Sequence, residues 1–575
     1  MSHHRRRHLP GHLFAPALCA VILFACSSGG TESGGAGSSD TTPPLPGSVA
    51  DGFGADVDTQ TSTSVLSANW QGFTDDTGIA FYEAAVGTTA GGTEVLGWTP
   101  VGATTSVSAG GFALDVGTTY YIAIRAHDAA GNVSAPAFSD GVQVTGGGGG
   151  SPVTTARALS QWGITWTFAQ ERTVGQFANG DWWVLGPVDV IDIAPRTANV
   201  GGRQLHGSMV NPVPNGRHGY DSALYGGFAP ERYDAALNVA IGVSAGSPLH
   251  LGTGSSLVST ISQQTPDTGG SLSELRTAAV LTVLAATPPA NAFRPPYSGS
   301  DKTVRFTEAQ LDYTRLAALS APAGTPAMAT VADQFARVWL DHCSGWVSRY
   351  MHPVLNMPDY SRDFTAVVGT GALMLNLDFT FAQKRDLLVR MVQLGIDNHG
   401  NVLGGATWPG TGGQCSGRKF PILFAGHLLH DPTMTAIGTS HRTVYLGPGN
   451  PQNRTVFGED TQTFVVQETS PGVYNWNFGN YNATHVGMPE WGNSHAANPG
   501  NDNVAWGADS YRRCCTANAW LGQCLALRVM GLRTLWNHDP FFAYVDRYVV
   551  QEPSGWLHAW EPWHATMWAQ YRPSF

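Results

Sequence analysis

The sequence predicts a multidomain protein in which two β-domains are followed by an α-helical domain. Short apolar runs that alternate with turn residues begin near residue 49, and a glycine run at residues 146–151 interrupts them. After about Thr325 the apolar period changes from two to about 3.6 residues, which indicates helices. The part after the glycine run exceeds the size at which a single core stops growing, so we expect two packed domains there.

Residues 1–25 predict a lipoprotein signal peptide. Arginines at 5–7 precede an apolar run over 13–25 that is too short to span a bilayer. The run ends in "LFAC", which resembles a bacterial lipobox and implies cleavage before Cys26 and lipid attachment to it; cleavage elsewhere as an ordinary signal peptide is the alternative. We therefore expect a lipid-anchored protein at the outer membrane or cell surface. Residues 26–48, rich in Ser, Gly, Thr and Pro, are typical of a flexible tether.

Residues 49–145 predict a small β-domain. "SVLSANW" ends on Trp70, and Tyr120, Ile122 and Ile124 alternate along a second apolar run. These segments resemble a fibronectin type III domain, in which Trp70 matches the core tryptophan of the second strand. The resemblance implies a seven-stranded β-sandwich that acts as a spacer; a binding role stays open. Residues 146–155 form the glycine-rich linker that follows.

Residues 156–290 predict a second β-domain. The pair Asn179-Gly180 lies between two β-like runs and is a strong hairpin signal. Two further runs, at residues 256–262 and 276–285, are also typical of strands, and we expect a β-sandwich.

Residues 291–575 predict the helical domain. Apolar periodicity favours helices over 326–342, 363–379, 382–398, 420–430 and 516–531. The second, fourth and fifth are almost wholly apolar and should be buried, whereas 382–398 is amphipathic. Buried helices joined to amphipathic ones predict concentric layers, as in an (α/α) toroid. A β-sandwich beside such a toroid resembles several polysaccharide lyase and glycoside hydrolase families, although no family-specific motif is present.

Composition narrows the class of ligand. Charged residues make up only 13%, tryptophan occurs 18 times and the net charge is −11. This balance argues against nucleic acid and suits a polysaccharide as partner. No Cys/His zinc spacing is present, so we predict no cofactor and no metal ligands, and leave a structural metal open.

Five cysteines remain after the lipid-bearing one. A helix from about Thr516 would hold Cys524 about 15 Å from Cys514 and Cys515, too far for a disulfide. A bridge from Cys415 to Cys514 or Cys515 is the alternative.

Four polar loops flank the apolar helices and carry the candidate site residues. The first, 348–364, offers acid, base and charge-stabilising groups for catalysis: Tyr350, His352, Asn356, Tyr360, Arg362 and Asp363. Asp363 also suits a helix N-cap. The other three, at 404–421, 474–496 and 509–515, predict substrate-binding residues: Trp408, Arg418, Lys419, Trp476, Tyr481, His485, Trp491, Tyr511 and Arg512. Glu490 in the third adds a catalytic carboxyl.

Three functions fit these residues. A lyase acting on a uronic acid needs Arg, Asn, His and Tyr, which the first loop supplies, with Arg418 or Arg512 for the sugar carboxylate. A glycoside hydrolase needs two carboxyls, for which Asp363 or Asp359 with Glu490 is the best pair. A glycan-binding protein without turnover is the third. The residue types slightly favour the lyase.

Overall fold

The structure is a computed structural model. It describes residues 40–575 except for 53–55, 61–64, 111, 113, 116, 145–153, 215, 225–228, 266–272, 344–351, 357–361, 409, 411–412, 414, 441–456, 478, 493–515 and 552–560. The predicted signal peptide and most of the tether, including Cys26, lie outside the described residues. Among the helices that are described, none is both long and apolar enough to cross a membrane.

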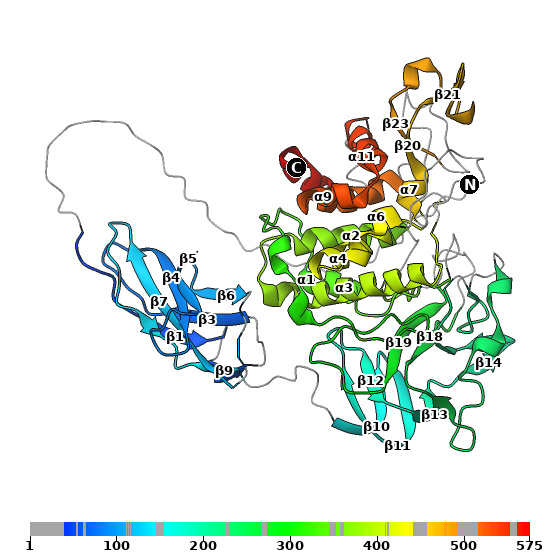
Figure 1. The fold of residues 1–575 in the computed structure, drawn as a ribbon, viewed down its shortest axis with the longest axis horizontal. Helices are drawn as coiled ribbons and strands as arrows, with labels where there is room; N and C mark the ends of the chain where they lie inside the picture. The colour runs from blue at the N-terminus through cyan, green and yellow to red at the C-terminus, as the bar shows by residue number, and fades with distance from the viewer. Residues whose placement is uncertain are drawn as a thin grey trace, which may run out of the picture.

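The first domain is a β-sandwich, as predicted (Figure 1). One sheet joins β1, β3 and β6, and the other joins β2, β9, β7, β4 and β5, with β8 paired to β7. The strands are β1 (Ser48–Asp51), β2 (Thr59–Gln60), β3 (Val65–Gln71), β4 (Ile79–Gly87), β5 (Leu96–Gly102), β6 (Ser106–Gly110), β7 (Thr119–Asp128), β8 (Ala137–Phe138) and β9 (Val142–Val144).

The residues that carried the resemblance form the core of this sandwich. Trp70 is buried on β3 and packs edge-on against Tyr82, with ring centroids 5.3 Å apart. Tyr120 is buried on β7, and its hydroxyl accepts a hydrogen bond from the backbone N–H of Asp115 at 2.8 Å. A buried tyrosine that bonds back to the chain a few residues upstream is a recurrent fastening of such sandwiches.

The second β-domain is built on one eight-stranded mixed sheet. Its order is β16-β18-β19-β12-β11-β13-β17, and β10 also pairs with β11. The strands are β10 (Thr154–Gln161), β11 (Ile164–Gln176), β12 (Trp182–Leu185), β13 (Val188–Ala194), β16 (Ser208–Val210), β17 (Leu249–Leu251), β18 (Ser255–Ser262) and β19 (Leu275–Leu284), with a separate ribbon of β14 (Ala198–Val200) and β15 (Arg203–Leu205).

This arrangement differs from the two packed sheets expected for residues 156–290. The reason is β19, which pairs antiparallel with β18 and parallel with β12, so it joins the early and late strands into one sheet. The predicted hairpin is confirmed: β11 and β12 pair antiparallel around the turn, where Gly180 has a φ of 88°. Such a positive φ is open to glycine without strain.

The helices fill the C-terminal half of the chain (Figure 1). They are α1 (Met328–Gln334), α2 (Arg362–Leu375), α3 (Phe381–Leu403), α4 (Lys419–Leu428), α5 (Pro432–Thr435), α6 (Ile437–Ser440), α7 (Gly458–Gln462), α9 (Ala517–Val529), α10 (Arg533–Trp536), α11 (Asp539–Gln551) and α13 (Pro562–Tyr571). Between α7 and α9 lie the short strands β20 (Thr463–Val465), β21 (Glu468–Ser470), β22 (Val473–Tyr474) and β23 (Pro489–Trp491).

The predicted division into buried and amphipathic helices is confirmed. α2, α4 and α9 are buried on most sides, and α2 packs against α9 while α3 packs against α4. On α3 the predicted apolar residues Leu387, Leu388, Met391 and Val392 are all buried. The closed ring of an (α/α) toroid itself stays a prediction.

The first predicted helix is shorter than expected. α1 ends at Gln334, and the chain then continues between the helices and the sheet. Phe335 and Trp339 join the hydrophobic core of the helices, whereas Val338 and Leu340 join a core on the sheet side. Side chains that must point alternately to two cores favour an extended chain over a helix.

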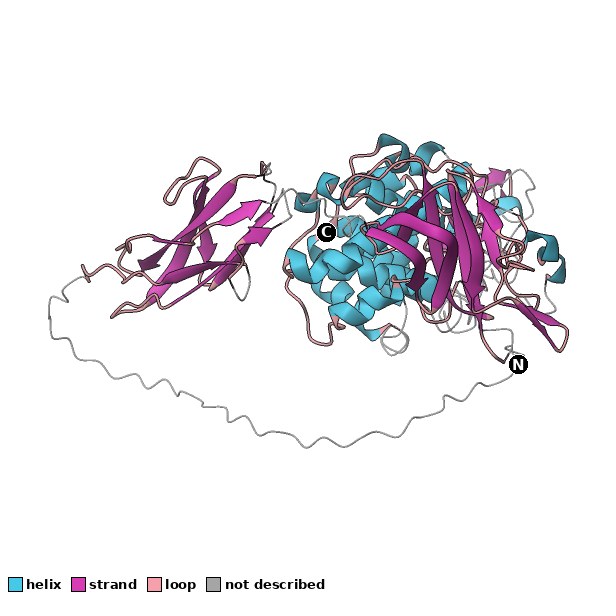
Figure 2. Cartoon of the chain, turned by 90° about the horizontal axis from the view of Figure 1, so that it is seen from below, coloured by secondary structure: helices cyan, strands magenta, loops and turns pink. Residues whose placement is uncertain are grey.

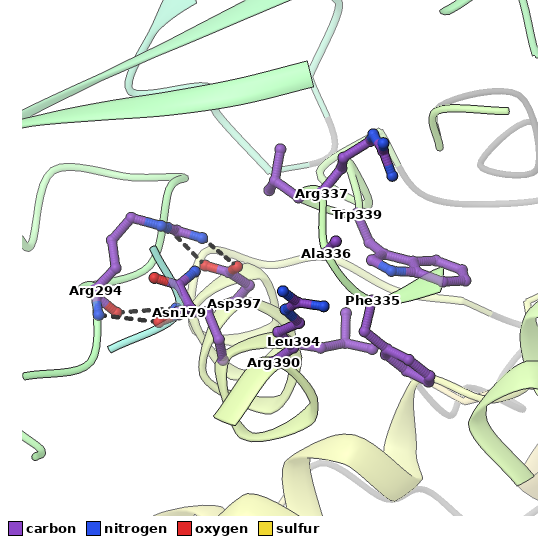
Figure 3. A pocket seen from close by; sticks show the side chains of 11 residues that line it. Asn179, Arg294, Phe335, Ala336, Arg337, Trp339, Arg390, Leu394 and Asp397 are labelled. Atoms are coloured by element: carbon purple, nitrogen blue, oxygen red, sulfur yellow. Dashed lines mark hydrogen bonds and ion pairs between the residues drawn. The ribbon is translucent and has the colours of Figure 1, made fainter. Parts of the chain in front are cut away.

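The second β-domain packs against the helices, as Figure 2 shows. Buried Arg294 joins the two: its Nε donates to Asp181 of the β11–β12 turn at 2.6 Å, and its two Nη atoms donate to Asp397 of α3 at 3.0 and 2.6 Å (Figure 3). A fully paired buried guanidinium fixes the position of both partners.

Candidate active site

The second predicted loop ends in two buried cations. Arg418 donates to Asp341 at 3.1 Å and lies 3.7 Å from the ring centroid of Phe364. Lys419 donates to both oxygens of Asp460, at 3.0 and 2.7 Å, and to the backbone carbonyl of Trp536. Both side chains are fully buried, so they hold the core together instead of meeting a sugar anion, and the structure does not support their predicted substrate-binding role.

The described part of the first predicted loop places His352 and Asn356 in the core. His352 is buried against Trp339, with ring centroids 6.2 Å apart. Asn356 is also buried, and its amide donates to the carbonyl of Arg337 at 3.0 Å. These contacts give His352 and Asn356 a packing role where a catalytic one was predicted. Tyr350 and Tyr360 lie outside the described residues, so their predicted roles stay predictions.

Four of the predicted site residues of the third loop are internal. Trp491 and Glu490 are fully buried on β23, where Glu490 lies 3.5 Å from Arg547. Tyr481 and His485 are buried too, and stack edge to face at 5.9 Å. Because burial removes them from a sugar, the predicted pair of Glu490 with Asp363 or Asp359 and the predicted stacking roles are not supported. Asp359 lies outside the described residues.

Two predicted tryptophans behave differently. Trp408 is fully buried and stacked on Phe457, so it is part of the core. Trp476 is 39% exposed and has a positive φ of 54°, which leaves its ring on the surface. Trp476 is therefore the predicted stacking residue that the structure leaves open to a ligand. Tyr511 and Arg512, of the fourth loop, lie outside the described residues.

The structure nevertheless brings the first three loops together at the start of α2. Arg418 covers Phe364, as described above. Glu459 of α7 accepts a hydrogen bond from the backbone N–H of Gly417 at 2.8 Å and another from Gln523 of α9 at 2.7 Å. Burial raises the pKa of the Glu459 carboxyl. β20, which follows α7 directly, pairs with β23 of the third loop.

A partly buried ion pair lies at the same end of α2. Arg362 and Asp363 occupy the first turn, and the Nε of Arg362 donates to the Asp363 carboxylate at 2.9 Å. The predicted N-cap role of Asp363 is wrong because α2 already begins at Arg362. An acidic residue in the first turn still complements the helix dipole.

Glu561, the residue before α13, adds a second carboxyl next to Arg362 and Asp363. It interacts electrostatically with both Asp363 and Arg362. α2 and α13 are joined by a hydrogen bond of 2.8 Å between Thr370 and His564. Burial first, and then the negative charge of Asp363, raise the pKa of Glu561 from 4.5 to about 7, against a lowering contribution from Arg362. We name Arg362, Asp363 and Glu561 the carboxyl site.

The carboxyl site can transfer protons near neutral pH. Two carboxyls whose surroundings differ are suited to separate acid and base roles. Glu561 is protonated up to about pH 7, while Asp363 is held in an ion pair with Arg362. Both carboxyl residues are only partly buried.

Sequence reasoning missed two of these carboxyl residues for different reasons. Glu561 stands in the aromatic segment "HAWEPWHA", outside the four loops, and only its position before a proline marked it as a helix start. Glu459 stands in "GEDTQ", a segment between the second and third loops for which no role was predicted. Neither pattern shows that another helix brings a second carboxyl close.

A second buried polar cluster also escaped prediction. The Tyr297 hydroxyl accepts hydrogen bonds from the backbone N–H groups of Asp341 at 2.8 Å and His342 at 3.1 Å. Burial lowers the pKa of His342 to about 3, so this imidazole is neutral. Tyr220 packs edge-on against His342 at 5.8 Å. Since all three rings are fully buried, they serve as a hydrogen-bonded joint between the domains.

One pocket among the described residues lies between α3 and the β11–β12 turn (Figure 3). It is lined by Asn179, Arg337, Arg390 and the paired Arg294 and Asp397. Arg337 stacks on Trp162 at 4.5 Å, and Arg390 donates to the carbonyl of Ala332. These contacts occupy the arginines, and the pocket holds no acid–base pair.

Comparisons with known proteins show no family for this chain. No family model matches the sequence, and no curated protein matches it. Among solved structures, the twitchin kinase region from C. elegans is similar at 18% identity over 18% of this chain and 17% of that one, with a TM-score of 0.14. Titin module A71 from human cardiac muscle is similar at 17% identity over 18% of this chain and 95% of that one, also with a TM-score of 0.14.

A third similar structure is chitinase ChiA74 from Bacillus thuringiensis. It is 19% identical over 31% of this chain and 21% of that one, with a TM-score of 0.14. The present chain thus spans about a fifth of that chitinase. We draw no functional argument from similarities at these TM-scores.

Proposed function

We propose that this protein is a glycan-degrading enzyme, and that hydrolysis of a glycosidic bond at the carboxyl site is its reaction. The observation that supports this is the partly exposed Glu561, whose pKa is raised to about 7 beside the Arg362–Asp363 ion pair. The composition, poor in charge and rich in tryptophan, agrees with a sugar substrate.

The two carboxyls divide the work. Glu561, protonated at neutral pH, donates its proton to the glycosidic oxygen as the bond breaks. Asp363 is the ionised carboxylate: it either activates a water molecule as a general base or attacks the sugar as a nucleophile. Arg362 holds it in place through the 2.9 Å hydrogen bond. The separation of the two carboxyls during catalysis decides whether configuration inverts or is retained.

Hydrolysis is proposed in place of elimination, which the residue types slightly favoured, for a physical reason. A lyase needs a cation for the uronate carboxylate, and Arg418 and Lys419 are fully buried in ion pairs. Among the described residues of the first loop, His352 and Asn356 are buried as well. The carboxyl site, by contrast, offers two partly exposed carboxyls and one arginine.

β-Elimination is the second candidate, and Arg362 is the observation that favours it. Its side chain is 18% exposed, so its guanidinium can also reach the carboxylate of a uronic acid. In that reaction Glu561 would protonate the leaving oxygen.

The test is incubation of the purified chain with neutral and acidic polysaccharides. Hydrolysis produces new reducing ends without ultraviolet absorbance, elimination adds the absorbance of an unsaturated uronate, and a glycan-binding protein produces neither. We expect Glu561→Gln to lower kcat by about 100-fold or more, because general acid catalysis contributes about 10²–10⁴. The matched control is Glu171→Gln, an exposed carboxyl on β11 that should keep full activity. Full activity in Glu561→Gln would remove Glu561 from the reaction.

We also propose that the enzyme is anchored to the cell surface through Cys26. The apolar run and "LFAC" at its end support this. In the native host, Cys26→Ser should move the protein from the membrane fraction to the soluble fraction. A membrane-bound Cys26→Ser variant would contradict the anchor.

A further inference from the structure

Three carboxylates converge at one end of the first β-domain. Asp51 ends β1, Asp56 lies shortly before β2, and Asp140 lies shortly before β9. One oxygen from each lies within 4.8 Å of the oxygens from the other two. Asp51 and Asp56 are five residues apart and Asp140 comes from a distant segment, and together they direct like charges at one point.

Asp51 is the unusual member of this trio. Its side chain belongs to a residue that is only 1% exposed. Its Oδ2 accepts a hydrogen bond from the N–H of Gly141 at 3.1 Å, but its Oδ1 is buried and has no hydrogen-bond partner among the residues that the structure describes. A buried carboxylate oxygen without a partner destabilises the fold unless a cation or a hydrogen-bond donor meets it.

Among the described residues, no cationic group contributes to the electrostatics of Asp51. Burial raises the pKa of Asp51 to about 6, hydrogen bonds from Ser139 and Gly141 oppose this, and the negative charges of Asp56 and Asp140 raise it further. Asp56 is itself oriented by a hydrogen bond from the backbone N–H of Asp51 at 2.8 Å. The trio is thus arranged as ligands and left without a counter-ion.

We propose that Asp51, Asp56 and Asp140 bind a divalent cation of the hard, oxygen-preferring class, and specifically Ca²⁺. Ca²⁺ takes carboxylate oxygens at about 2.3–2.6 Å. Two ligands of one such ion are at most about 5 Å apart, which agrees with the 4.8 Å span of the three oxygens. The unpartnered Oδ1 of Asp51 then gains the partner that it lacks.

The position of the site gives the ion a structural role. β2 pairs with β9 through only two residue pairs, and β9 is the last strand before the linker. An ion held by Asp51, Asp56 and Asp140 would fasten the end of β1 and the start of both short strands. The calcium site therefore stabilises the end of the β-sandwich at which β1 ends and β2 and β9 begin.

A second acidic trio, Asp40, Asp75 and Asp76, carries no such proposal. Asp75 is only partly buried, and its Oδ2 accepts hydrogen bonds from Thr77 and from the N–H of Gly78, as in an ordinary turn.

The test is isothermal titration of the chelator-treated full chain with CaCl2 and, separately, with MgCl2. We expect a binding event with a dissociation constant of about 1 mM or below, the range of extracellular calcium modules. Asp140→Asn and Asp51→Asn should each weaken that event at least ten-fold. Asp58→Asn, an exposed carboxyl in the same domain outside the trio, is the matched control and should leave it unchanged.

Unfolding temperature supplies an independent readout. Without Ca²⁺, Asp51→Asn should raise the unfolding temperature of the β-sandwich because the change removes a buried charge. Added Ca²⁺ should raise the unfolding temperature of the wild type but not that of Asp51→Asn. If Asp51→Asn fails to fold, the more exposed Asp140 variant decides. No calcium binding up to about 10 mM, or binding that Asp140→Asn leaves intact, would overturn the proposal. None of these outcomes depends on glycan turnover.

Discussion

At the scale of single residues, burial decides which charged side chains are structural. Lys419 and Arg418 were predicted as ligands of a sugar anion because they end a glycine-rich loop. That pattern shows a close approach of the backbone, but it contains no information on the distant Asp460 and Asp341 that neutralise these cations. Trp408, Trp476 and Trp491 could not be distinguished by sequence, although of the three Trp476 lies on the surface and the other two are buried.

Lys419→Met tests the buried ion pair. The change leaves Asp460 buried without its cation, so we expect a loss of about 3–5 kcal/mol in the free energy of unfolding. Urea denaturation measures it. The matched control is Arg305→Met. Arg305 and Asp301 form an ion pair whose side chains are 56% and 62% exposed, so this pair should contribute less than about 1 kcal/mol to stability. Equal losses in the two variants would contradict the structural role of Lys419.

The pH dependence of activity tests Glu561. Because its pKa is about 7, activity should fall as pH rises through 7 and the acid loses its proton. Arg362 lowers this pKa, so Arg362→Gln should move the alkaline limb of the kcat/KM profile to higher pH. An unchanged limb in Arg362→Gln would contradict the coupling.

The same group sets a pH dependence of stability with a defined sign. Between its ordinary pKa of 4.5 and the folded value of about 7, Glu561 binds a proton in the folded state that the unfolded chain has released. Stability should therefore fall as pH rises through this window. Chemical denaturation at several pH values should show that Glu561→Gln lacks this decrease, and an identical decrease in the variant would contradict the assignment.

At the scale of elements, apolar periodicity predicted the helices well where they are long and buried. The helices α2, α3, α4 and α9 lie within a few residues of the predicted ranges. The spacing of their apolar residues fits a helix and does not fit a strand. α1 was predicted too long because the alternation of Phe335, Val338, Trp339 and Leu340 between two cores depends on the docked sheet. The single sheet of the second β-domain escaped prediction for the same reason: strand pairing is a long-range property.

The crossing of α3 and α4 depends on Gly395. A Cβ at this position would lie 2.1 Å from the carbonyl oxygen of Pro421 and 2.6 Å from the Cβ of Ala425. Gly395→Ala should therefore cost about 1–3 kcal/mol of stability, as overpacking does. Thermal and urea unfolding measure this. Gly252→Ala, where nothing lies within 4 Å, is the control and should change stability little; an equal effect of the two would contradict the close crossing.

At the scale of the whole molecule, the hydrophobic core of the first β-domain is separate, whereas buried polar contacts join the second β-domain to the helices. The first β-domain has a hydrophobic core of its own, which shares no residue with the others. The second β-domain and the helices are joined by the buried Arg294 and by the Tyr297 hydroxyl. The sequence predicted the first boundary through its glycine run, but the second junction is made by residues about 100 positions apart and has no local signal.

The parallel pairing of β12 with β19 constrains how this protein is made. β19 occupies the centre of the eight-stranded sheet but is the last of its strands to be synthesised, about 100 residues after β12. Until Leu284 has left the ribosome, the earlier strands hold an open apolar edge without its partner. Since translation proceeds at about 5–20 residues per second, this edge stays uncovered for several seconds during export or synthesis. We therefore expect that shortening the interval between β12 and β19 would raise the yield of folded protein.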